Sequence, residues 1–164
     1  MAATSPFVVA ILAESAEAQE DLRHTRDTLD RFGVAFLERA TETGRSTLRD
    51  TVSAFEAAGA SVFIVADTAN PAGTLSAAVS GLTLRPVLAV PMQTPPAPAL
   101  DALLATTRGG GGPPVASLAI GKAGAINAAL LAVAILANAD DTLRRKLDDF
   151  RAQQTANVLA DRLE

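Results

Sequence analysis

Cysteine, tryptophan and tyrosine are all missing from this chain of 164 residues, and histidine occurs only once, as His24. The lack of cysteine excludes disulfides and thiolate metal sites. A single histidine leaves an ordinary zinc site without its usual ligands. Aromatic residues make up 4% of the chain, all of them phenylalanine, so the base-stacking platforms of single-strand nucleic-acid binders are lacking. We therefore expect neither a metal centre nor a nucleic-acid partner.

Positive charge is scarce as well. The formal net charge is −4, and lysine and arginine form no cluster in the sequence, which again argues against nucleic acid. Residues 7–13 are apolar but too few, and too poor in preceding basic residues, for a signal peptide. We expect a cytoplasmic globular protein, with one domain over residues 1–164 and a short tail at 1–6.

Predicted strands and helices alternate along the chain. Apolar runs rich in β-branched residues predict strands, and apolar stripes at helical spacing predict helices. The predicted strands are 7–13, 34–39, 61–66, 86–90 and 115–120. The predicted helices are 17–32, 99–106, 121–138 and 140–163, with 71–82 as helix or loop. A further helix is predicted between a cap at Ser46 or Thr47 and its end at Gly59. Such alternation favours a parallel sheet with helices on both faces, and ligands then bind beyond the carboxyl ends of the strands.

The helix within residues 115–138 consists almost wholly of Ala, Leu, Ile and Val, interrupted by Asn127 and Asn138. Such a helix has no polar face that could contact solvent, so it must be covered on nearly every side. Alanine is only weakly apolar and the two asparagines break the run, so burial in protein is favoured over a membrane span. A chain of this size buries such a helix most easily inside an oligomer.

Two segments carry a family resemblance. LAIGKAGAINAALLA at 118–132 and PVLAVPMQ at 86–93 resemble the PurE family, and the similarity extends over about residues 7–159. This family comprises carboxyaminoimidazole ribonucleotide mutases and aminoimidazole ribonucleotide carboxylases of purine synthesis. The resemblance implies a flavodoxin-like three-layer α/β/α sandwich, an octamer, no metal and no organic cofactor. We also expect the C-terminal helix, residues 140–164, to pack on a neighbouring subunit.

The loops after the first two strands resemble the family's phosphate-binding loops only in part. Ser15 and Arg45 match the serine and arginine that look like phosphate ligands. The catalytic histidine of the family falls on Gly44. A fork of guanidinium donors beside a hydroxyl suits a phosphate. The alternative is a serine that caps a helix and an arginine in solvent.

The loop after the third strand and the glycine loop before the fifth also depart from the family pattern. Asn70 lies near the family's second histidine and Gly73 near its glycine, with the alignment of 67–74 shifting by a residue or two. The Met-Pro-x-Gly loop of the family has become four glycines, 109–112. The resemblance therefore implies that Ser15, Arg45, Asn70 and Gly73 contact substrate.

The family's reaction moves a carboxyl group between a ring nitrogen and a ring carbon, and its histidine shuttles a proton at the carbon. That task needs a group that titrates near neutrality, which glycine lacks. Glu14 and Glu42 lie in the facing loops and are candidates for carboxylate-based chemistry, the alternative being solvated loop charges. The protein is therefore a divergent mutase-like enzyme, a related enzyme with carboxylate chemistry, a non-catalytic anion-binding or regulatory oligomer, or a structural oligomer.

Two further basic residues stand out. His24 lies in a predicted helix away from its apolar stripe, so we expect it to face solvent or a subunit boundary. Lys122 begins the Ala-rich helix in Gly-Lys-Ala-Gly, which suggests phosphate binding but lacks P-loop spacing. We expect this segment to pack between subunits.

Overall fold

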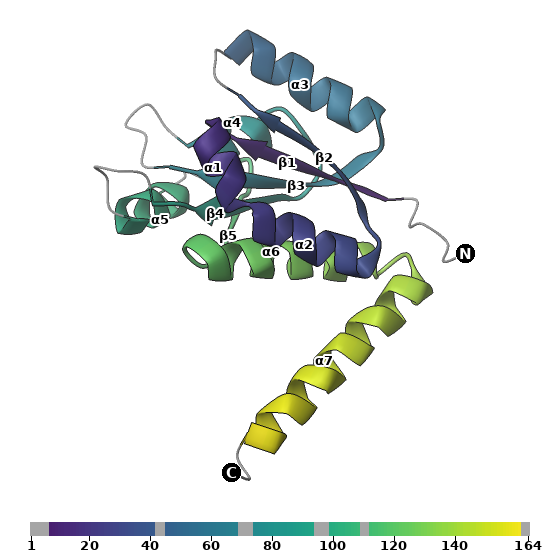
Figure 1. Ribbon diagram of the computed structural model, residues 1–164. Coiled ribbons are helices and arrows are strands. Elements are labelled where there is room, and N and C mark those ends of the chain that lie inside the picture. Colours follow the sequence, from purple (N-terminus) through teal and green to yellow (C-terminus); the bar gives the residue numbers. More distant parts are fainter. Residues whose placement is uncertain (1–6, 42–44, 69–73, 94–98, 109–111, 162–164) are drawn as a thin grey trace.

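A computed structural model describes residues 7–41, 45–68, 74–93, 99–108 and 112–161. Within these ranges five strands form one parallel sheet in the order β2-β1-β3-β4-β5 (Figure 1). The strands are β1 (Val8–Ala13), β2 (Ala35–Ala40), β3 (Ala60–Asp67), β4 (Val87–Pro91) and β5 (Ala116–Ser117). The helices are α1 (Ala16–Asp21), α2 (Arg23–Phe32), α3 (Arg45–Ala57), α4 (Leu75–Ser80), α5 (Ala99–Thr107), α6 (Gly121–Leu136) and α7 (Asp141–Asp161).

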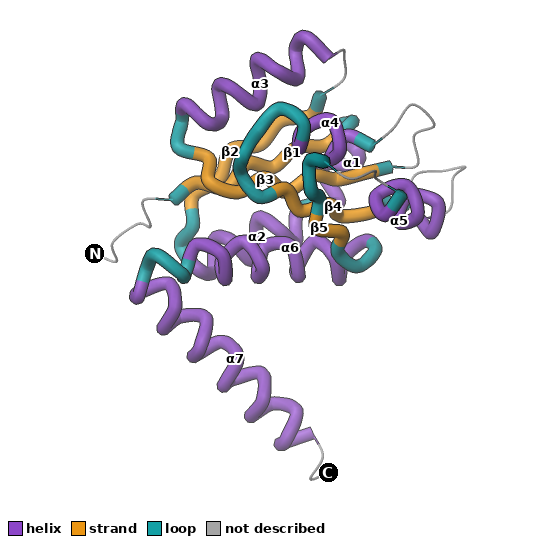
Figure 2. The backbone as a smooth tube through the Cα atoms, turned by 180° about the vertical axis from the view of Figure 1, so that it is seen from behind, coloured by secondary structure: helices purple, strands orange, loops and turns teal. Residues whose placement is uncertain are grey.

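Strand β1 is apolar throughout because both of its faces are covered. Val9 and Ile11 join the cluster that includes α2 and α6, whereas Ala10 and Leu12 join the cluster that includes α3 and α4. Side chains alternate between the faces of a strand, so a continuous apolar run is what a doubly covered strand requires. The predicted three-layer α/β/α sandwich is confirmed, and Figures 1 and 2 show α2 and α6 on one face and α3 and α4 on the other.

The predicted helix over 17–32 is two helices, α1 and α2, that meet at Leu22. This residue has φ −79° and ψ 7°, which ends α1, and the Arg26 Nη1 donates to the Gln19 carbonyl at 3.1 Å. Leu22 is fully buried. Apolar periodicity runs through the junction because both helices pack on the same core, so the break leaves no mark on the pattern. Gly33 ends α2 in the left-handed region at φ 71°, as its type predicts.

The predicted capping of α3 by Ser46 or Thr47 is wrong. The helix begins at Arg45, so both residues lie in its first turn. The first four N–H groups of a helix have no intrahelical acceptor. Hydroxyl residues therefore occur within the first turn as well as at the cap, and here they lie one and two residues after the helix start. The core stripe of Leu48, Val52 and Phe55 is buried as expected, and Gly59 follows the helix at φ 95°.

The fifth strand is much shorter than the predicted 115–120. Only Ala116 and Ser117 pair with β4, although the Leu118 N–H still donates to the Ala89 carbonyl at 2.9 Å. Two prolines precede β5, and proline has no N–H to give a ladder. The chain then turns at Gly121 into α6, where a Cβ on Gly124 would lie 1.7 Å from the Ala119 carbonyl oxygen.

Within one chain, α6 is covered on one side only. Its small residues Ala125, Ala128, Ala129 and Ala132 are fully buried against the sheet and α2. Its outer side leaves Leu131 37% exposed. The expectation that neighbours cover the rest of this helix stays a prediction.

Helix α7 leaves the body of the molecule (Figure 2). Asp140 caps it by accepting from the Thr142 and Leu143 N–H groups at 2.8 and 3.0 Å. Its first turns are anchored: Leu143 and Leu147 are buried, and Phe150 packs edge-on against Phe32 with ring centroids 5.5 Å apart. Every residue from 151 to 161 is exposed.

Candidate active site

Polar groups gather where β1 and β3 end, and we name Glu14, Ser15, Asp67, Thr68 and Ser76 the carboxyl-end cluster. The strand ends are tied laterally by backbone bonds. The Thr41 N–H donates to the Ala13 carbonyl at 2.7 Å, and the Met92 N–H donates to the Asp67 carbonyl at 2.8 Å. Strands β1 and β3 are neighbours in the sheet, so the cluster is set on rigid elements.

Ser15 is the N-cap of α1. Its Oγ accepts from the Ala18 N–H at 3.2 Å, which confirms the capping alternative. A hydroxyl that accepts one hydrogen bond still has a proton to donate. Capping and contact with an anion are therefore compatible at this residue.

Glu14 joins the ends of β1 and β3. It is half-buried, and the Thr68 Oγ1 donates to its Oε2. Glu14 is therefore bonded within the cluster and only partly open to solvent. A half-buried carboxylate with one bonded oxygen keeps acceptor capacity for a further proton or donor.

Asp67 is the functional candidate that sequence reasoning missed. Its carboxylate is fully buried and accepts from the Ser76 N–H at 2.9 Å and from the Ser76 Oγ. Burial raises the pKa of Asp67 from its ordinary 3.8 to about 6, the hydrogen bonds from Ser76 oppose this rise, and the nearby Glu14 carboxylate adds to it. The available signal was a carboxylate directly after a buried apolar strand, at the end of the sheet where ligands bind.

The structure describes only part of the predicted substrate-binding set. Ser15 and Glu14 lie together, and Arg45 begins α3 directly after the loop that follows β2. The side chain of Arg45 lies outside the described part of the structure. So do four whole residues of the predicted site, Glu42, Gly44, Asn70 and Gly73.

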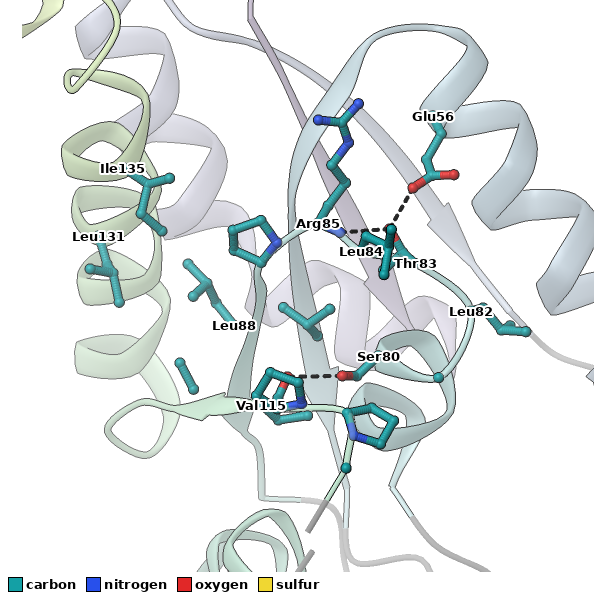
Figure 3. A pocket seen from close by; sticks show the side chains of 17 residues that line it. Glu56, Ser80, Leu82, Thr83, Leu84, Arg85, Leu88, Val115, Leu131 and Ile135 are labelled. Atoms are coloured by element: carbon teal, nitrogen blue, oxygen red, sulfur yellow. Dashed lines mark hydrogen bonds between the residues drawn. The ribbon is translucent and has the colours of Figure 1, made fainter. Parts of the chain in front are cut away.

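The opposite end of the sheet holds a large cavity of about 1400 Å³, which we name the apolar groove. The amino ends of β4 and β5 form its floor, and α6 forms one wall. Figure 3 shows Leu131 and Ile135 of α6 facing Leu88 across it, with the Ser80 Oγ donating to the Pro114 carbonyl at 2.8 Å. Leu84, which lines the groove, is entirely exposed. The carboxyl-end cluster and the apolar groove therefore lie at opposite ends of the sheet.

Two absences hold for the described ranges. No group of three or more His, Cys, Asp or Glu side chains there could hold a metal ion. No helix in those ranges is long and apolar enough to cross a membrane.

Comparisons with known proteins agree with this fold. A sequence model of the AIR carboxylase family matches residues 8–157. The N5-carboxyaminoimidazole ribonucleotide mutases of Brucella melitensis and Pseudomonas aeruginosa are 37% and 36% identical over 150 and 152 residues, which cover 92% and 93% of this chain and 93% of each relative. The crystal structure of Treponema denticola PurE superposes with a TM-score of 0.81 at 20% identity, covering 94% of this chain and 95% of that one.

A doubly covered parallel sheet with polar groups at its strand ends places the molecule among flavodoxin-like α/β proteins. More narrowly, the chain belongs to the AIR carboxylase family, the PurE family that its sequence resembles.

Proposed function

We propose that this protein acts in the purine pathway of the cytoplasm and binds a phosphorylated imidazole ribonucleotide at the carboxyl end of its sheet. The observation that carries the proposal is the position of Ser15, which caps α1 beside the Glu14–Thr68 bond where β1 and β3 end. Membership of a family with mutase relatives supplies the ligand class. Arg45, at the start of α3, would supply the guanidinium for the phosphate.

We propose further that histidine-dependent mutase turnover is reduced by about 10²–10⁴, the usual contribution of a positioned acid or base. The resemblance puts Gly44 and Asn70 at or near the family's histidines. Neither residue has a side chain that ionises near neutral pH.

The binding test is titration calorimetry with carboxyaminoimidazole ribonucleotide. We expect saturable binding by the wild type, weakened about tenfold or more in Arg45→Ala because a charge-assisted contact to phosphate is lost. Arg151→Ala, an exposed arginine on α7, is the matched control and should bind as the wild type does. Absence of binding by the wild type would overturn the proposal. Turnover equal to that of the mutase relatives would overturn the predicted loss at Gly44.

A second candidate is a related enzyme that uses carboxylate chemistry. It is favoured by the buried Asp67 near Glu14, because burial raises the pKa of the Asp67 carboxyl to about 6, in the range where acid–base catalysis works. Glu14 is the half-exposed member and would accept the proton that leaves the ring carbon, then release it to water. Glu14→Gln should abolish any residual turnover while nucleotide binding persists, and Glu20→Gln, an exposed glutamate, should change neither. Residual turnover that survives Glu14→Gln would exclude this candidate.

For the assembly, we propose a homo-oligomer, an octamer as the family resemblance implies, built from one PurE-like domain per chain. Three features support it: the uncovered side of α6, the apolar groove, and the exposed second half of α7 with Val158 and Leu159 each more than half exposed. We expect residues 140–164 to pack on a neighbouring copy. Light scattering behind size-exclusion chromatography measures the mass directly, and a monomeric mass at micromolar concentration would contradict the assembly.

A further inference from the structure

A second, smaller cleft lies beside the carboxyl end of β4, where the Met92 N–H joins it to Asp67 of the carboxyl-end cluster. It has a volume of about 230 Å³, below the roughly 300–1,000 Å³ of pockets for drug-sized ligands. Its lining residues come from the start of α2, the chain after β4 and the start of α6: Arg23, His24, Met92, Gln93, Gly121 and Lys122. A cleft of this size fits a small ion or a single phosphate group.

The lining carries basic groups and no acid. Arg23, His24 and Lys122 meet here in a protein whose net charge is −4. Among the described residues, none of their side chains has a hydrogen-bond or ion-pair partner. Of the described acids near the start of α2, Glu20 and Glu38 pair with Arg26 at 3.5 and 3.2 Å, and the exposed Asp27 does not line the cleft. Basic groups brought together without a counter-ion repel one another, so an anion between them is favourable.

The packing of α2 on α6 fixes these groups in place. The two helices lie side by side beneath the sheet (Figure 1). Near their starts, the buried Thr25 Oγ1 donates to the Ala125 carbonyl at 3.0 Å. Because this bond joins the first turn of α2 to the second turn of α6, it holds Arg23 and His24 beside Lys122.

The two helix starts add to the positive potential. Helices α2 and α6 have 10 and 16 residues, and neither has a side-chain cap or an acidic residue in its first turn. Unsatisfied N–H groups at a helix start favour negative charge. Helix starts and basic side chains therefore act in the same direction at this cleft.

We infer that the cleft formed by Arg23, His24 and Lys122 is a binding site for a small oxyanion, a phosphate ion or the phosphate group of a monoester. It is separate from the proposed nucleotide site. In the sheet, β3 lies between β1, which leads into Ser15, and β4, which ends beside the cleft.

The test uses His24 as its own reporter, since it is the chain's only histidine. The whole protein is prepared with isotope-labelled histidine, and the imidazole NMR signals are followed during titration with inorganic phosphate. A parallel titration uses ribose 5-phosphate, and a third uses sodium chloride at matched ionic strength. We expect a saturable shift of the His24 signals with phosphate and none with chloride. A response to ribose 5-phosphate alone would identify a monoester as the ligand, and a response to both would include the free ion.

Variants separate this site from general charge effects and from the proposed nucleotide site. Lys122→Ala should weaken the phosphate response about tenfold or more, and Arg49→Ala, an exposed arginine on the opposite face of the sheet, should leave it unchanged. Ser15→Ala should also leave it unchanged, so failure of the nucleotide site would not mimic failure of this one. Thermal unfolding verifies that Lys122→Ala, an exposed position, is folded.

Three results would overturn the inference. The first is His24 signals that ignore phosphate and ribose 5-phosphate. The second is a phosphate response that Lys122→Ala leaves intact. The third is a change in the His24 signals when the protein is diluted but not when phosphate is added, which would place the cleft at a contact between copies of the chain.

Discussion

The two ends of the sheet differ in what they offer a partner. At the carboxyl end, Glu14, Asp67 and Ser76 are tied into side-chain hydrogen bonds and largely withdrawn from solvent. At the amino end, the apolar groove is larger than any cavity needed for one nucleotide, and it is bordered by exposed leucines. By volume alone, the groove would be the first candidate for a ligand site. The exposed leucines of the groove suit contact with a protein surface instead, whereas the buried carboxyl with a raised pKa, Asp67, is at the other end.

The largest effect is expected from a charge placed in the groove. Leu131→Asp puts a carboxylate on the exposed side of α6, where we expect another copy to pack. Burying an unpaired charge there should cost about 4 kcal/mol, or roughly a thousandfold in the dissociation constant. Analytical ultracentrifugation over a concentration series measures the change. Ser53→Asp, an exposed position on α3, is the control. If Leu131→Asp has the same oligomeric mass as the wild type, the apolar groove is not a contact between copies of the chain.

The next effect concerns stability and pH at the carboxyl end. The pKa of Asp67 is raised in the folded state from 3.8 to about 6, so the folded protein holds a proton that the unfolded chain has already released. Stability from this group is therefore fully present below pH 3.8 and is lost as the pH rises to 6, by about 3 kcal/mol.

Asp67→Asn should remove that loss. Its amide oxygen can still accept from the Ser76 N–H, and its NH₂ can donate to the Ser76 hydroxyl. We expect the variant to be more stable than the wild type at pH 7 and equal to it near pH 4, as measured by urea denaturation across that range. Asp148→Asn, an exposed carboxyl on α7, controls for net charge. Parallel pH profiles for wild type and Asp67→Asn would show that Asp67 ionises normally.

The smallest effect separates the two roles of Ser15. Ser15→Ala should cost about 1 kcal/mol because α1 loses its cap. Ser15→Asp should keep most of that stability, since aspartate caps as well as serine does. It should nevertheless bind the nucleotide more weakly than Ser15→Ala, because its carboxylate repels a phosphate. Thr74→Ala, which removes the cap of α4, shows the cost of a cap at a neighbouring helix. Equal nucleotide affinity in both Ser15 variants would leave Ser15 with the capping role alone.

Sequence patterns predicted the scaffold well because both faces of the central strands are buried. The continuous apolar runs of β1 and β3, and the Ala-rich face of α6, follow directly from that burial. Local boundaries were harder. The break at Leu22 leaves the apolar pattern unchanged. Hydroxyl residues occur both as caps and in the first turn, so α3 was predicted to start two or three residues late.

The carboxyl-end cluster was predictable only in part. Glu14 and Ser15 follow a strand, and strand ends are where ligands bind. Asp67 has the same position after β3, yet its burial depends on Ser76, nine residues further along the chain. That contact exists because α4 starts at Leu75, which the sequence pattern left open as helix or loop.

Gly124 has a consequence for how this protein could change through evolution. Since an added methyl group would collide with the Ala119 carbonyl oxygen, the turn into α6 admits no side chain without a shift of backbone. Substitutions that alter what the molecule binds are therefore excluded at Gly124 itself, whereas Gly121 has open space around it and the exposed Lys122 can vary. A lineage of such proteins can exchange its chemistry freely at one end of the sheet while this junction keeps the same shape.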